Sequence, residues 1–416
     1  MIEALVICLL FMINFDVVND IPTTNKTIFL FTNLDVPLSD DGAILDDSKI
    51  KKALPTINYL VKTGARVVIA THLGHPAREF DTRYSTKAIA GYLDKRMACD
   101  VKFCKDCIGE QSRREIFRAE YGSIIVLENL LFYPEELNCD LNFAKQLADG
   151  MNIFVNDNFE CCRKSYASNL GVPLFVRATA GLVLTEEIKK LDVFLNPANQ
   201  FTTAIIGGNQ TAKKMDLINS LVDRVKCLFL AGEVANTFLS ASGKNVGISL
   251  YETGMEIQVE KLLNKAKKNG CLLLLPSDVR VVKSSFENSD KMESKSVDDI
   301  EVDDLIVDVG DQYLQDVYDI LDLSRSVFWD GALGATEFEK YRFATMALCE
   351  KIATCSKKKR IFSIVNGSDV VDLLKNAKLL ENISFIPSSF ASAKHYIGGR
   401  VLPGIEILRR LSKQLV

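Results

Sequence analysis

The chain has 416 residues, of which 48% are apolar and 25% charged. This predicts a compact protein with two domains of about 200 residues each and excludes extensive disorder. Its 50 Lys and Arg residues stand against 54 Asp and Glu residues, so the formal net charge is −4. We therefore expect no nucleic-acid partner and no membrane partner, and any phosphate binding has to be local.

The cysteines and histidines limit the chemistry further. Eleven cysteines occur without regular spacing, which is typical of reduced thiols and favours the cytoplasm. Cys104 and Cys107 form a Cys-x-x-Cys pair, for which a redox motif and two ordinary cysteines at a strand end are both open. Only three histidines are present, His72, His75 and His395, which argues against a histidine-based metal site.

The N-terminus carries an apolar run from Ala4 to Ile13 that is too short to span a bilayer. Glu3 replaces the usual basic flank of a secretory signal, and no small-residue cleavage site follows Phe15. For residues 1–11, a signal, a leading strand and a misplaced start with Met12 as the true one all stay open.

In the first half of the chain, short apolar or β-branched runs alternate with longer stretches of helical spacing. The predicted strands are Thr27–Thr32, Arg66–Thr71, Ser123–Leu127 and Asn152–Val155. The predicted helices between them are Lys49–Lys62, Thr86–Met97 and Leu141–Ala148. This alternation predicts a parallel sheet with helices on both faces.

The same alternation restarts after a helical stretch over Thr185–Phe194 and a break at Asn196-Pro197. Further strands are predicted at Thr202–Ile206, Cys227–Leu230, Cys271–Leu275, Leu305–Val309, Val327–Trp329 and Ile361–Val365. The charged stretch Lys283–Asp304 is interpreted as a solvated surface segment. The fold prediction is α/β, with two doubly wound parallel-sheet domains.

Two loops that follow predicted strands carry polar or glycine-rich sequence, and ligands of open α/β sheets bind at such loops. Gly207-Gly208 opens a segment that ends in Lys213-Lys214, where backbone amides at a helix start favour a phosphate. It lacks the Walker A pattern, and a plain strand-to-helix turn is the more frequent meaning of such a sequence. The other loop, His72-Leu73-Gly74-His75, could bring two imidazoles to an anion, although a simple turn explains it equally.

Taken in order from Thr27 to Ile407, these segments resemble the phosphoglycerate kinase family. The resemblance rests on many collinear motifs, namely Asp35-Val36-Pro37-Leu38, Ala53-Leu54-Pro55-Thr56-Ile57, His72-Leu73-Gly74, Asp106-Cys107-Ile108-Gly109-Glu110, Glu128-Asn129-Leu130, Val155-Asn156-Asp157, Gly207-Gly208, Ala235-Asn236-Thr237-Phe238, Trp329-Asp330-Gly331 and Val401-Leu402-Pro403-Gly404. Cys107 lies within one of them, which favours the ordinary reading of the Cys-x-x-Cys pair.

The resemblance implies two Rossmann-like domains joined by a hinge helix. Residues 1–184 would bind 3-phosphoglycerate, 185–199 would form the hinge and 200–400 would bind Mg-nucleotide, while 401–416 would pack back on the N-terminal domain. The implied reaction converts ATP and 3-phosphoglycerate into ADP and 1,3-bisphosphoglycerate. We expect a cytoplasmic monomer, and the sequence names no protein partner.

On the substrate side, the resemblance implies a depleted set of cations. An arginine of the family's Arg-Val-Asp-Phe-Asn loop becomes Phe31, and its Asp and Asn are exchanged, as Asn33 and Asp35. The family's catalytic arginine matches Lys49, and other arginines match His75, Leu131 and Lys164. The expected substrate-binding residues are Asn33, Asp35, His72, His75 and Lys164. Lysine cannot make the bidentate fork of arginine to phosphate.

The nucleotide side is altered as well. The family's lysine that stabilises the transferring phosphoryl group matches Gln210, whereas Lys214 is retained. Asp330 puts a carboxylate where a phosphate should pass, and Phe390 stands at a glycine position. The expected nucleotide-binding residues are Gly207, Gly208, Lys214, Gly310, Glu337, Gly367 and Asp369, with Asp369 also contacting Mg²⁺ through the nucleotide.

Two hypotheses follow from these substitutions. One is a catalytically impaired pseudoenzyme with residual nucleotide binding, supported by simultaneous loss at nearly every cationic position, with Lys49 and Gln210 at the catalytic positions. The other is a divergent but active kinase, supported by full-length resemblance and by His72, Lys214, Glu337 and Asp369. The first is favoured.

Overall fold

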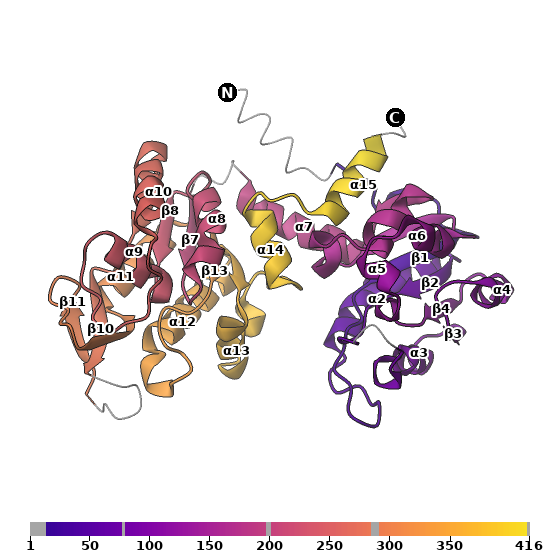
Figure 1. The fold of residues 1–416 in the computed structure, drawn as a ribbon, viewed down its shortest axis with the longest axis horizontal. Helices are drawn as coiled ribbons and strands as arrows, with labels where there is room; N and C mark the ends of the chain where they lie inside the picture. The colour runs from indigo at the N-terminus through magenta and orange to yellow at the C-terminus, as the bar shows by residue number, and fades with distance from the viewer. Residues whose placement is uncertain (1–13, 77–79, 197–200, 284–290, 414–416) are drawn as a thin grey trace. The chain divides into compact units, whose positions relative to one another are not determined.

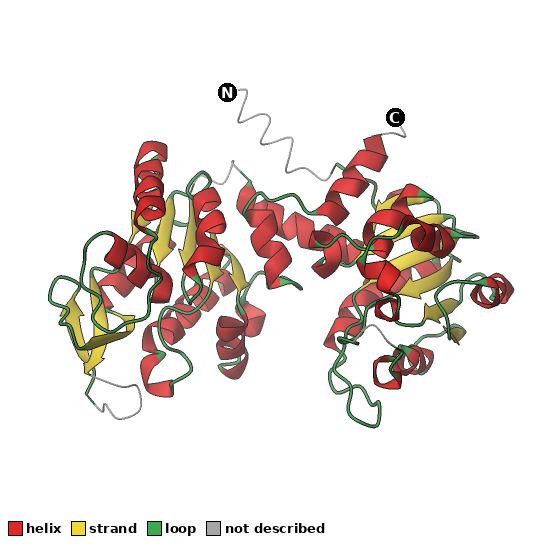
Figure 2. Cartoon of the chain, viewed as in Figure 1, coloured by secondary structure: helices red, strands yellow, loops and turns green. Residues whose placement is uncertain are grey.

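A computed structural model describes residues 14–76, 80–196, 201–283 and 291–413. Contacts divide the chain into two units (Figures 1 and 2). The N-terminal unit comprises Met12–Lys189 together with Val401–Val416, and the C-terminal unit contains Lys190–Arg400. The predicted signal or leading strand at residues 1–11 lies outside the described residues. Within the described ranges, no helix has the length and hydropathy needed to cross a bilayer.

The N-terminal unit is built on a parallel sheet with strand order β3-β4-β2-β1-β5-β6. The strands are β1 (Thr27–Thr32), β2 (Arg66–Ala70), β3 (Val101–Cys104), β4 (Ile124–Leu127), β5 (Ile153–Asp157) and β6 (Arg177–Ala180). Every residue of β1 and β2 is buried, because crossover helices cover both faces of a parallel sheet. On one face, Ile28 and Leu30 join Ile57 of α2 in a single apolar cluster.

Helices and short helical turns connect these strands. They are η1 (Val18–Asp20), α2 (Ser48–Lys62), η2 (Thr82–Tyr84), α3 (Lys87–Asp94), α4 (Glu110–Arg118), η3 (Leu130–Phe132), α5 (Pro134–Leu137), α6 (Leu141–Ala148), η4 (Glu160–Arg163), η5 (Ala167–Gly171) and η6 (Val172–Leu174). Helix α15 (Pro403–Lys413) packs on β6, η4 and η5 of this unit. Helix α7 (Leu182–Leu195) carries the boundary between the units, and its role as a hinge stays a prediction.

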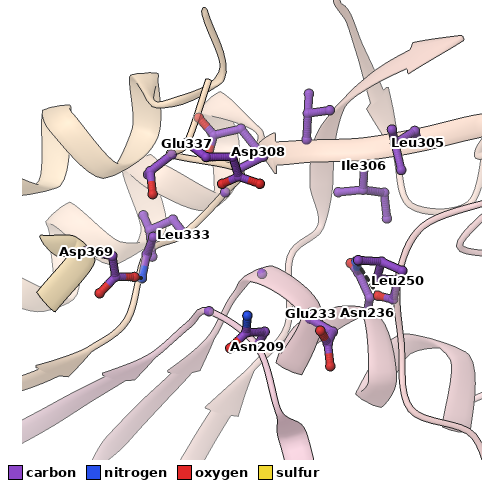
Figure 3. A pocket seen from close by; sticks show the side chains of 17 residues that line it. Asn209, Glu233, Asn236, Leu250, Leu305, Ile306, Asp308, Leu333, Glu337 and Asp369 are labelled. Atoms are coloured by element: carbon purple, nitrogen blue, oxygen red, sulfur yellow. Dashed lines mark hydrogen bonds between the residues drawn. The ribbon is translucent and has the colours of Figure 1, made fainter. Parts of the chain in front are cut away.

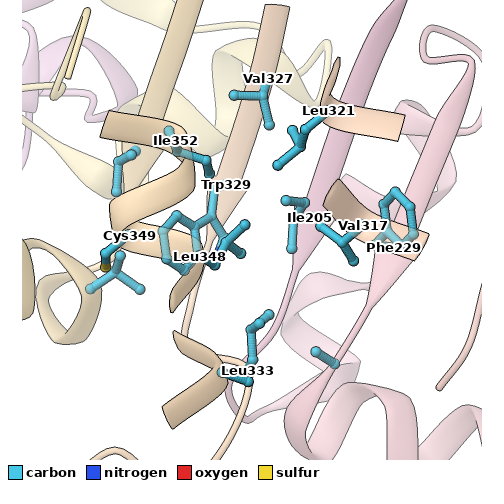
Figure 4. Close-up of a cluster of buried hydrophobic side chains, with 14 of the residues drawn as sticks. Ile205, Phe229, Val317, Leu321, Val327, Trp329, Leu333, Leu348, Cys349 and Ile352 are labelled. Atoms are coloured by element: carbon cyan, nitrogen blue, oxygen red, sulfur yellow. The ribbon is translucent and has the colours of Figure 1, made fainter. Parts of the chain in front are cut away.

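The C-terminal unit contains a second parallel sheet with strand order β14-β13-β7-β8-β9. The strands are β7 (Thr202–Ile206), β8 (Cys227–Leu230), β9 (Leu272–Leu274), β13 (Ser326–Asp330) and β14 (Phe362–Asn366). The helical segments are α8 (Thr211–Leu221), α9 (Gly232–Ala241), α10 (Glu256–Asn269), α11 (Asp311–Leu323), η7 (Glu339–Tyr341), α12 (Phe343–Lys357), α13 (Ser368–Asn376), η8 (Leu380–Asn382) and α14 (Phe390–Ile397). The fully buried Trp329 lies in the core with Ile205 and Leu348 (Figure 4).

The prediction of two doubly wound α/β domains is confirmed, but part of the C-terminal unit differs from expectation. Strands β10 (Asp278–Lys283), β11 (Glu293–Ser296) and β12 (Asp304–Val309) form a separate antiparallel sheet. The predicted strand Leu305–Val309 therefore lies outside the parallel sheet, and the stretch predicted as a surface segment contains β11. Val279, Val281 and Val297 contribute to a small apolar cluster at this sheet.

Both parallel sheets have a point where the strand order reverses, and such points bind ligands in doubly wound folds. In the N-terminal unit it lies between β1 and β5, and in the C-terminal unit between β7 and β13. The carboxyl ends of these strands lead into Asn33, Asn158, Gly207 and Gly331. The predicted Gly207-Gly208 loop thus lies at the switch point of the C-terminal sheet, whereas the predicted His72 loop follows β2, the strand beside β1.

Candidate functional site

The N-terminal basin is the set of side chains at the carboxyl ends of β1, β2 and β5 and on the facing start of α2: Asn33, Asp35, Lys49, His72 and Glu160. The Lys49 ammonium lies 3.5 Å from Asp35 Oδ2 and 3.7 Å from Glu160 Oε2. Asn33 Nδ2 donates to Glu160 Oε2 at 2.7 Å. The remaining Asp35 oxygen accepts a hydrogen bond from the Gly74 amide at 2.8 Å. Two carboxylates of the chain itself therefore compensate the charge of Lys49.

His72 is held on both ring nitrogens. Its Nε2 lies 2.8 Å from Oε1 of the fully buried Glu136, and its Nδ1 lies 3.5 Å from Cys161 Sγ. The ring also makes an edge contact with Phe31, at 5.4 Å between centroids. Burial alone would lower the pKa of His72, but Cys161 and Glu136 raise it to about 10. Both ring nitrogens of His72 are thus already engaged by groups of the chain.

The other two predicted substrate residues, His75 and Lys164, are less constrained. His75 is exposed and Lys164 is partly buried. Neither side chain forms an ion pair with the described residues. Nearby, the buried Nε of Arg163 has no hydrogen-bond partner among them. The structure thus places Asn33, Asp35 and Lys49 in one polar cluster, together with Glu160. The sequence reasoning missed Glu160, although it is an acid only four positions before Lys164.

The C-terminal pocket is a cavity of about 300 Å³ in the C-terminal unit (Figure 3). The Gly208 loop, the start of α9, strand β12, residues 332–337 and the start of α13 form its walls. Of the predicted nucleotide residues, Gly208, Glu337 and Asp369 line it. Gly207, Lys214 and Gly367 do not line it, although Gly207 lies next to Ala332 and Gly367 next to Asp369.

Close backbone packing requires glycine at and beside the pocket wall. A Cβ at Gly207 would lie 2.0 Å from the Ala332 carbonyl oxygen, so no larger residue fits without moving the backbone. Gly208 has φ +70°, which favours glycine, and its amide donates to the Ala332 carbonyl at 2.7 Å. Gly367 precedes α13 with φ +114°. These glycines allow the backbone turns that are typical of phosphate-binding loops. The Gly208 amide, however, already donates to Ala332.

Lys214 is paired with a carboxylate inside the C-terminal unit. Its Nζ donates to the Gly207 carbonyl at 2.5 Å and lies 3.4 Å from Asp330 Oδ2. Lys394 Nζ lies 3.8 Å from Asp330 Oδ1, which also accepts a hydrogen bond from Asn366 Nδ2 at 2.5 Å. The side chain of Asp330 is only 2% exposed. One buried carboxylate therefore faces two lysines.

Gln210, at the family's catalytic lysine position, is exposed and does not line the pocket. It precedes α8 with φ +61°, a left-handed conformation that is uncommon outside glycine. Its amide donates to Glu233 Oε1 at 3.3 Å, and the Ala212 amide donates to Glu252 Oε2 at 2.8 Å. Carboxylates of the chain thus already bind amides at the start of α8.

Asp369 fits the expected contact with a nucleotide-bound metal ion. One of its oxygens accepts a hydrogen bond from the Ala332 amide at 2.9 Å, and the other accepts none from the described residues. Mg²⁺ is commonly held by one or two carboxylates together with phosphate oxygens. The free oxygen of Asp369 could therefore take that role.

Gly310 does not line the pocket. Its amide donates to the Asp278 carbonyl, and a Cβ there would clash with the Asp278 carboxylate. Asp308, two residues earlier on β12, lines the pocket instead. Burial raises the pKa of Asp308 to about 7, although the amides of Ala344 and Val309 donate to it. Asp308 was not predicted from the sequence. Its position just before Gly310, which was predicted to bind the nucleotide, could have pointed to it.

One further carboxylate cluster lies on the antiparallel sheet. Among the described residues, only Glu301, Asp303 and Asp304 bring three acidic groups close enough for one metal ion. Lys283 pairs with all three, and Lys295 pairs with Glu301 and Asp304. The cluster is therefore an ion-pair network.

Comparison with known proteins identifies the family. A family model described as phosphoglycerate kinase matches residues 18–399. The phosphoglycerate kinase of Wolbachia pipientis wMel is 33% identical over 388 residues, covering 93% of this chain and 96% of that protein. The one of Prochlorococcus marinus strain MIT 9515 is 33% identical over 384 residues, covering 92% and 95%. The structure of phosphoglycerate kinase from Coxiella burnetii matches with a TM-score of 0.87 and 29% identity, covering 95% of this chain and 99% of that one. This chain belongs to the phosphoglycerate kinase family.

Proposed function

We propose that this chain is a catalytically impaired member of the family that retains ligand binding in its C-terminal pocket. The observation that carries the proposal is the pairing of Lys214 with the buried Asp330 at 3.4 Å. Phosphoryl transfer depends on positioned cations around the moving phosphoryl group. A lysine that is already compensated by a buried carboxylate offers little of that stabilisation.

The N-terminal basin supports the same proposal. Lys49, at the catalytic arginine position, faces Asp35 and Glu160, and both nitrogens of His72 are engaged. Phe31 and Leu131 supply no charge where the family has arginine. Because 3-phosphoglycerate is strongly anionic near neutral pH, it needs several uncompensated cations to be desolvated. We therefore propose that 3-phosphoglycerate binds weakly, or not at all.

For the nucleotide side, the proposed ligands are an adenine nucleotide and its Mg²⁺. Asp369 would contact the ion, which would neutralise part of the phosphate charge when bound. Glu337 and Gly208 would contact the nucleotide from the pocket wall. We propose a cytoplasmic protein, since none of the ten cysteines in the described chain forms a disulfide, as is usual in reducing compartments. By its resemblance to the family, we also propose a monomer.

A coupled assay with ATP, Mg²⁺ and 3-phosphoglycerate tests the proposal. The expected turnover is at least about a thousandfold below that of the Wolbachia relative, because each missing preorganised charge commonly costs 10²–10³ in rate. The Wolbachia enzyme in the same buffer is the positive control. Turnover within about tenfold of that control would support the alternative of a divergent, active kinase and overturn the proposal.

A further inference from the structure

The wall of the C-terminal pocket is acidic. The residues that line it include four with carboxyl side chains and no Lys, Arg or His. These four are Glu233, Asp308, Glu337 and Asp369. Figure 3 shows them distributed around the cavity, on α9, on β12, on the loop after Ala332 and at the start of α13. In the absence of Mg²⁺, a polyanionic ligand in this cavity would face the like charge of Glu233, Glu337 and Asp369, whereas burial raises the pKa of Asp308 to about 7.

The cations closest to the pocket do not offset this charge. Lys214 and Lys394 both face Asp330, at 3.4 and 3.8 Å. Lys214 also donates to the Gly207 carbonyl. Because Asp330 is 2% exposed, water screens these interactions only weakly. The Asp330 carboxylate thus takes the place of an external anion beside these lysines.

Three backbone amides near the pocket are also occupied. The Gly208 amide donates to Ala332, the Gln210 amide to Glu233 and the Ala212 amide to Glu252. A phosphate at a helix N-terminus depends on such amides being free. A phosphate at the start of α8 would have to replace acceptors that the chain supplies itself.

The remaining surface suits an uncharged ligand. Apolar side chains of Leu250, Leu305, Ile306 and Leu333 line the cavity beside polar Asn236 and Thr336. Small-molecule sites typically combine an apolar lining with a few polar groups in a volume of about 300–1,000 Å³. The cavity of about 300 Å³ is at the small end of that range.

We propose that the C-terminal pocket selects an uncharged nucleoside over the corresponding nucleoside triphosphate, and that Asp330 is a residue that sets this selectivity. The inference rests on the proposed function for the choice of adenine compounds. It goes beyond that function in the order of affinities. In the absence of Mg²⁺, each phosphate added to adenosine should weaken binding, whereas a kinase site is expected to bind the triphosphate most tightly.

Calorimetric titrations with adenosine, AMP and ATP, in the absence of Mg²⁺, test the order. Adenosine is expected to bind at least about tenfold more tightly than ATP. The phosphates of ATP would lose their hydration beside carboxylates and gain no charged hydrogen bonds in return. Asp330→Asn should raise ATP affinity about tenfold or more by releasing the two lysines, and leave adenosine affinity unchanged. Asp322→Asn is the matched control, since Asp322 pairs with Lys351 at the surface of the same unit.

The salt dependence of ATP binding gives a second test that needs no variant. Raising NaCl from about 0.05 to about 0.3 M screens repulsion, so ATP affinity should stay constant or rise, whereas a cationic site would lose affinity. ATP binding tighter than adenosine, with affinity that falls in salt, would overturn this inference and leave the impaired kinase in place. Binding of none of the three compounds at about 5 mM would overturn the retained nucleotide site as well.

Discussion

The N-terminal basin and the C-terminal unit each place a carboxylate against a lysine, but in different surroundings. In the basin, Lys49 and its partners Asp35 and Glu160 are between 35% and 42% exposed. In the C-terminal unit, Lys214 is 11% and Asp330 2% exposed. Water screens the charges of the first cluster, so each contributes little to stability. In the second pair, removing one partner would leave an uncompensated charge in the interior, which is strongly destabilising. The same loss of free positive charge therefore has different consequences for stability in the two units.

The two regions also differ in what remains for a ligand. The C-terminal pocket keeps a cavity of about 300 Å³ and glycines in left-handed turns. In the basin, the aromatic ring of Phe31 packs on His72, and Glu136 binds the imidazole. A fold can thus keep the shape of one site while the charged contacts of both are redirected within the chain.

The largest expected effect is the contrast between Lys214→Ala and Lys49→Ala. Lys214→Ala leaves Asp330 buried with only the more distant Lys394, so the free energy of unfolding should fall by about 3 kcal/mol or more. Lys49→Ala should lower it by less than about 1 kcal/mol. Urea unfolding measures both.

A double variant checks the cause of that contrast. Lys214→Ala combined with Asp330→Asn should recover part of the lost stability, because the isolated buried charge is gone. If Lys214→Ala and Lys49→Ala lowered the free energy of unfolding equally, burial would not be what distinguishes the Lys214–Asp330 pair from the Lys49 cluster.

An effect of comparable size concerns pH and the basin. The pKa of His72 is raised from 6.5 to about 10, so its stabilising contribution is complete below pH 6.5 and is lost as the pH rises through about 10. Between these values the free energy of unfolding should fall by up to about 1.4 kcal/mol per pH unit from this group.

The variant His72→Asn isolates this contribution. Its unfolding free energy, measured in urea from pH 6.5 to 10, should show a shallower decline than that of the unaltered chain. The same slope in both proteins would mean that the contacts of His72 with Glu136 and Cys161 do not stabilise its protonated form.

The smallest effect is expected for Glu160→Gln. This change removes one of two half-exposed carboxylates near Lys49, so stability should change by less than about 1 kcal/mol and affinity for 3-phosphoglycerate by less than about tenfold. Glu120→Gln, at an exposed position in the same unit, is the control. A gain in affinity of about a hundredfold would show that Glu160 alone blocks the basin.

Strands with long buried apolar runs were predictable from the sequence. β1, β7 and β8 have the predicted bounds, because all their residues are buried and read as continuous apolar or β-branched segments. β3 (VKFC) and β6 (RATA) were not predicted. Each has only four residues of mixed polarity, too few to show the alternation of polar and apolar side chains that indicates a strand. The antiparallel sheet was missed because β11 (ESKS) is polar and partly exposed, and only its pairing with β10 defines it as a strand.

The candidate sites were predictable as a set of substitutions but not as a set of contacts. Asp330 was recognisable as a carboxylate in the phosphate path, whereas its pairing with Lys214 and Lys394 depends on α8, β13 and α14 coming together. Glu160 and Lys49 are far apart in the chain, and only the folded N-terminal unit brings them within 3.7 Å. Gly310 and Asp308 show the limit of transferring roles by motif, since residues only two positions apart at the end of β12 have different surroundings.

The central claim is that ligand affinity survives in the C-terminal pocket and not in the N-terminal basin. Two calorimetric titrations of the full chain, one with adenosine or ADP and one with 3-phosphoglycerate, test it most directly. We predict measurable binding of the adenine compound and weaker or undetectable binding of 3-phosphoglycerate, because Lys49 and His72 are already engaged by the chain. Binding of 3-phosphoglycerate that is tighter than that of both adenine compounds would contradict the claim.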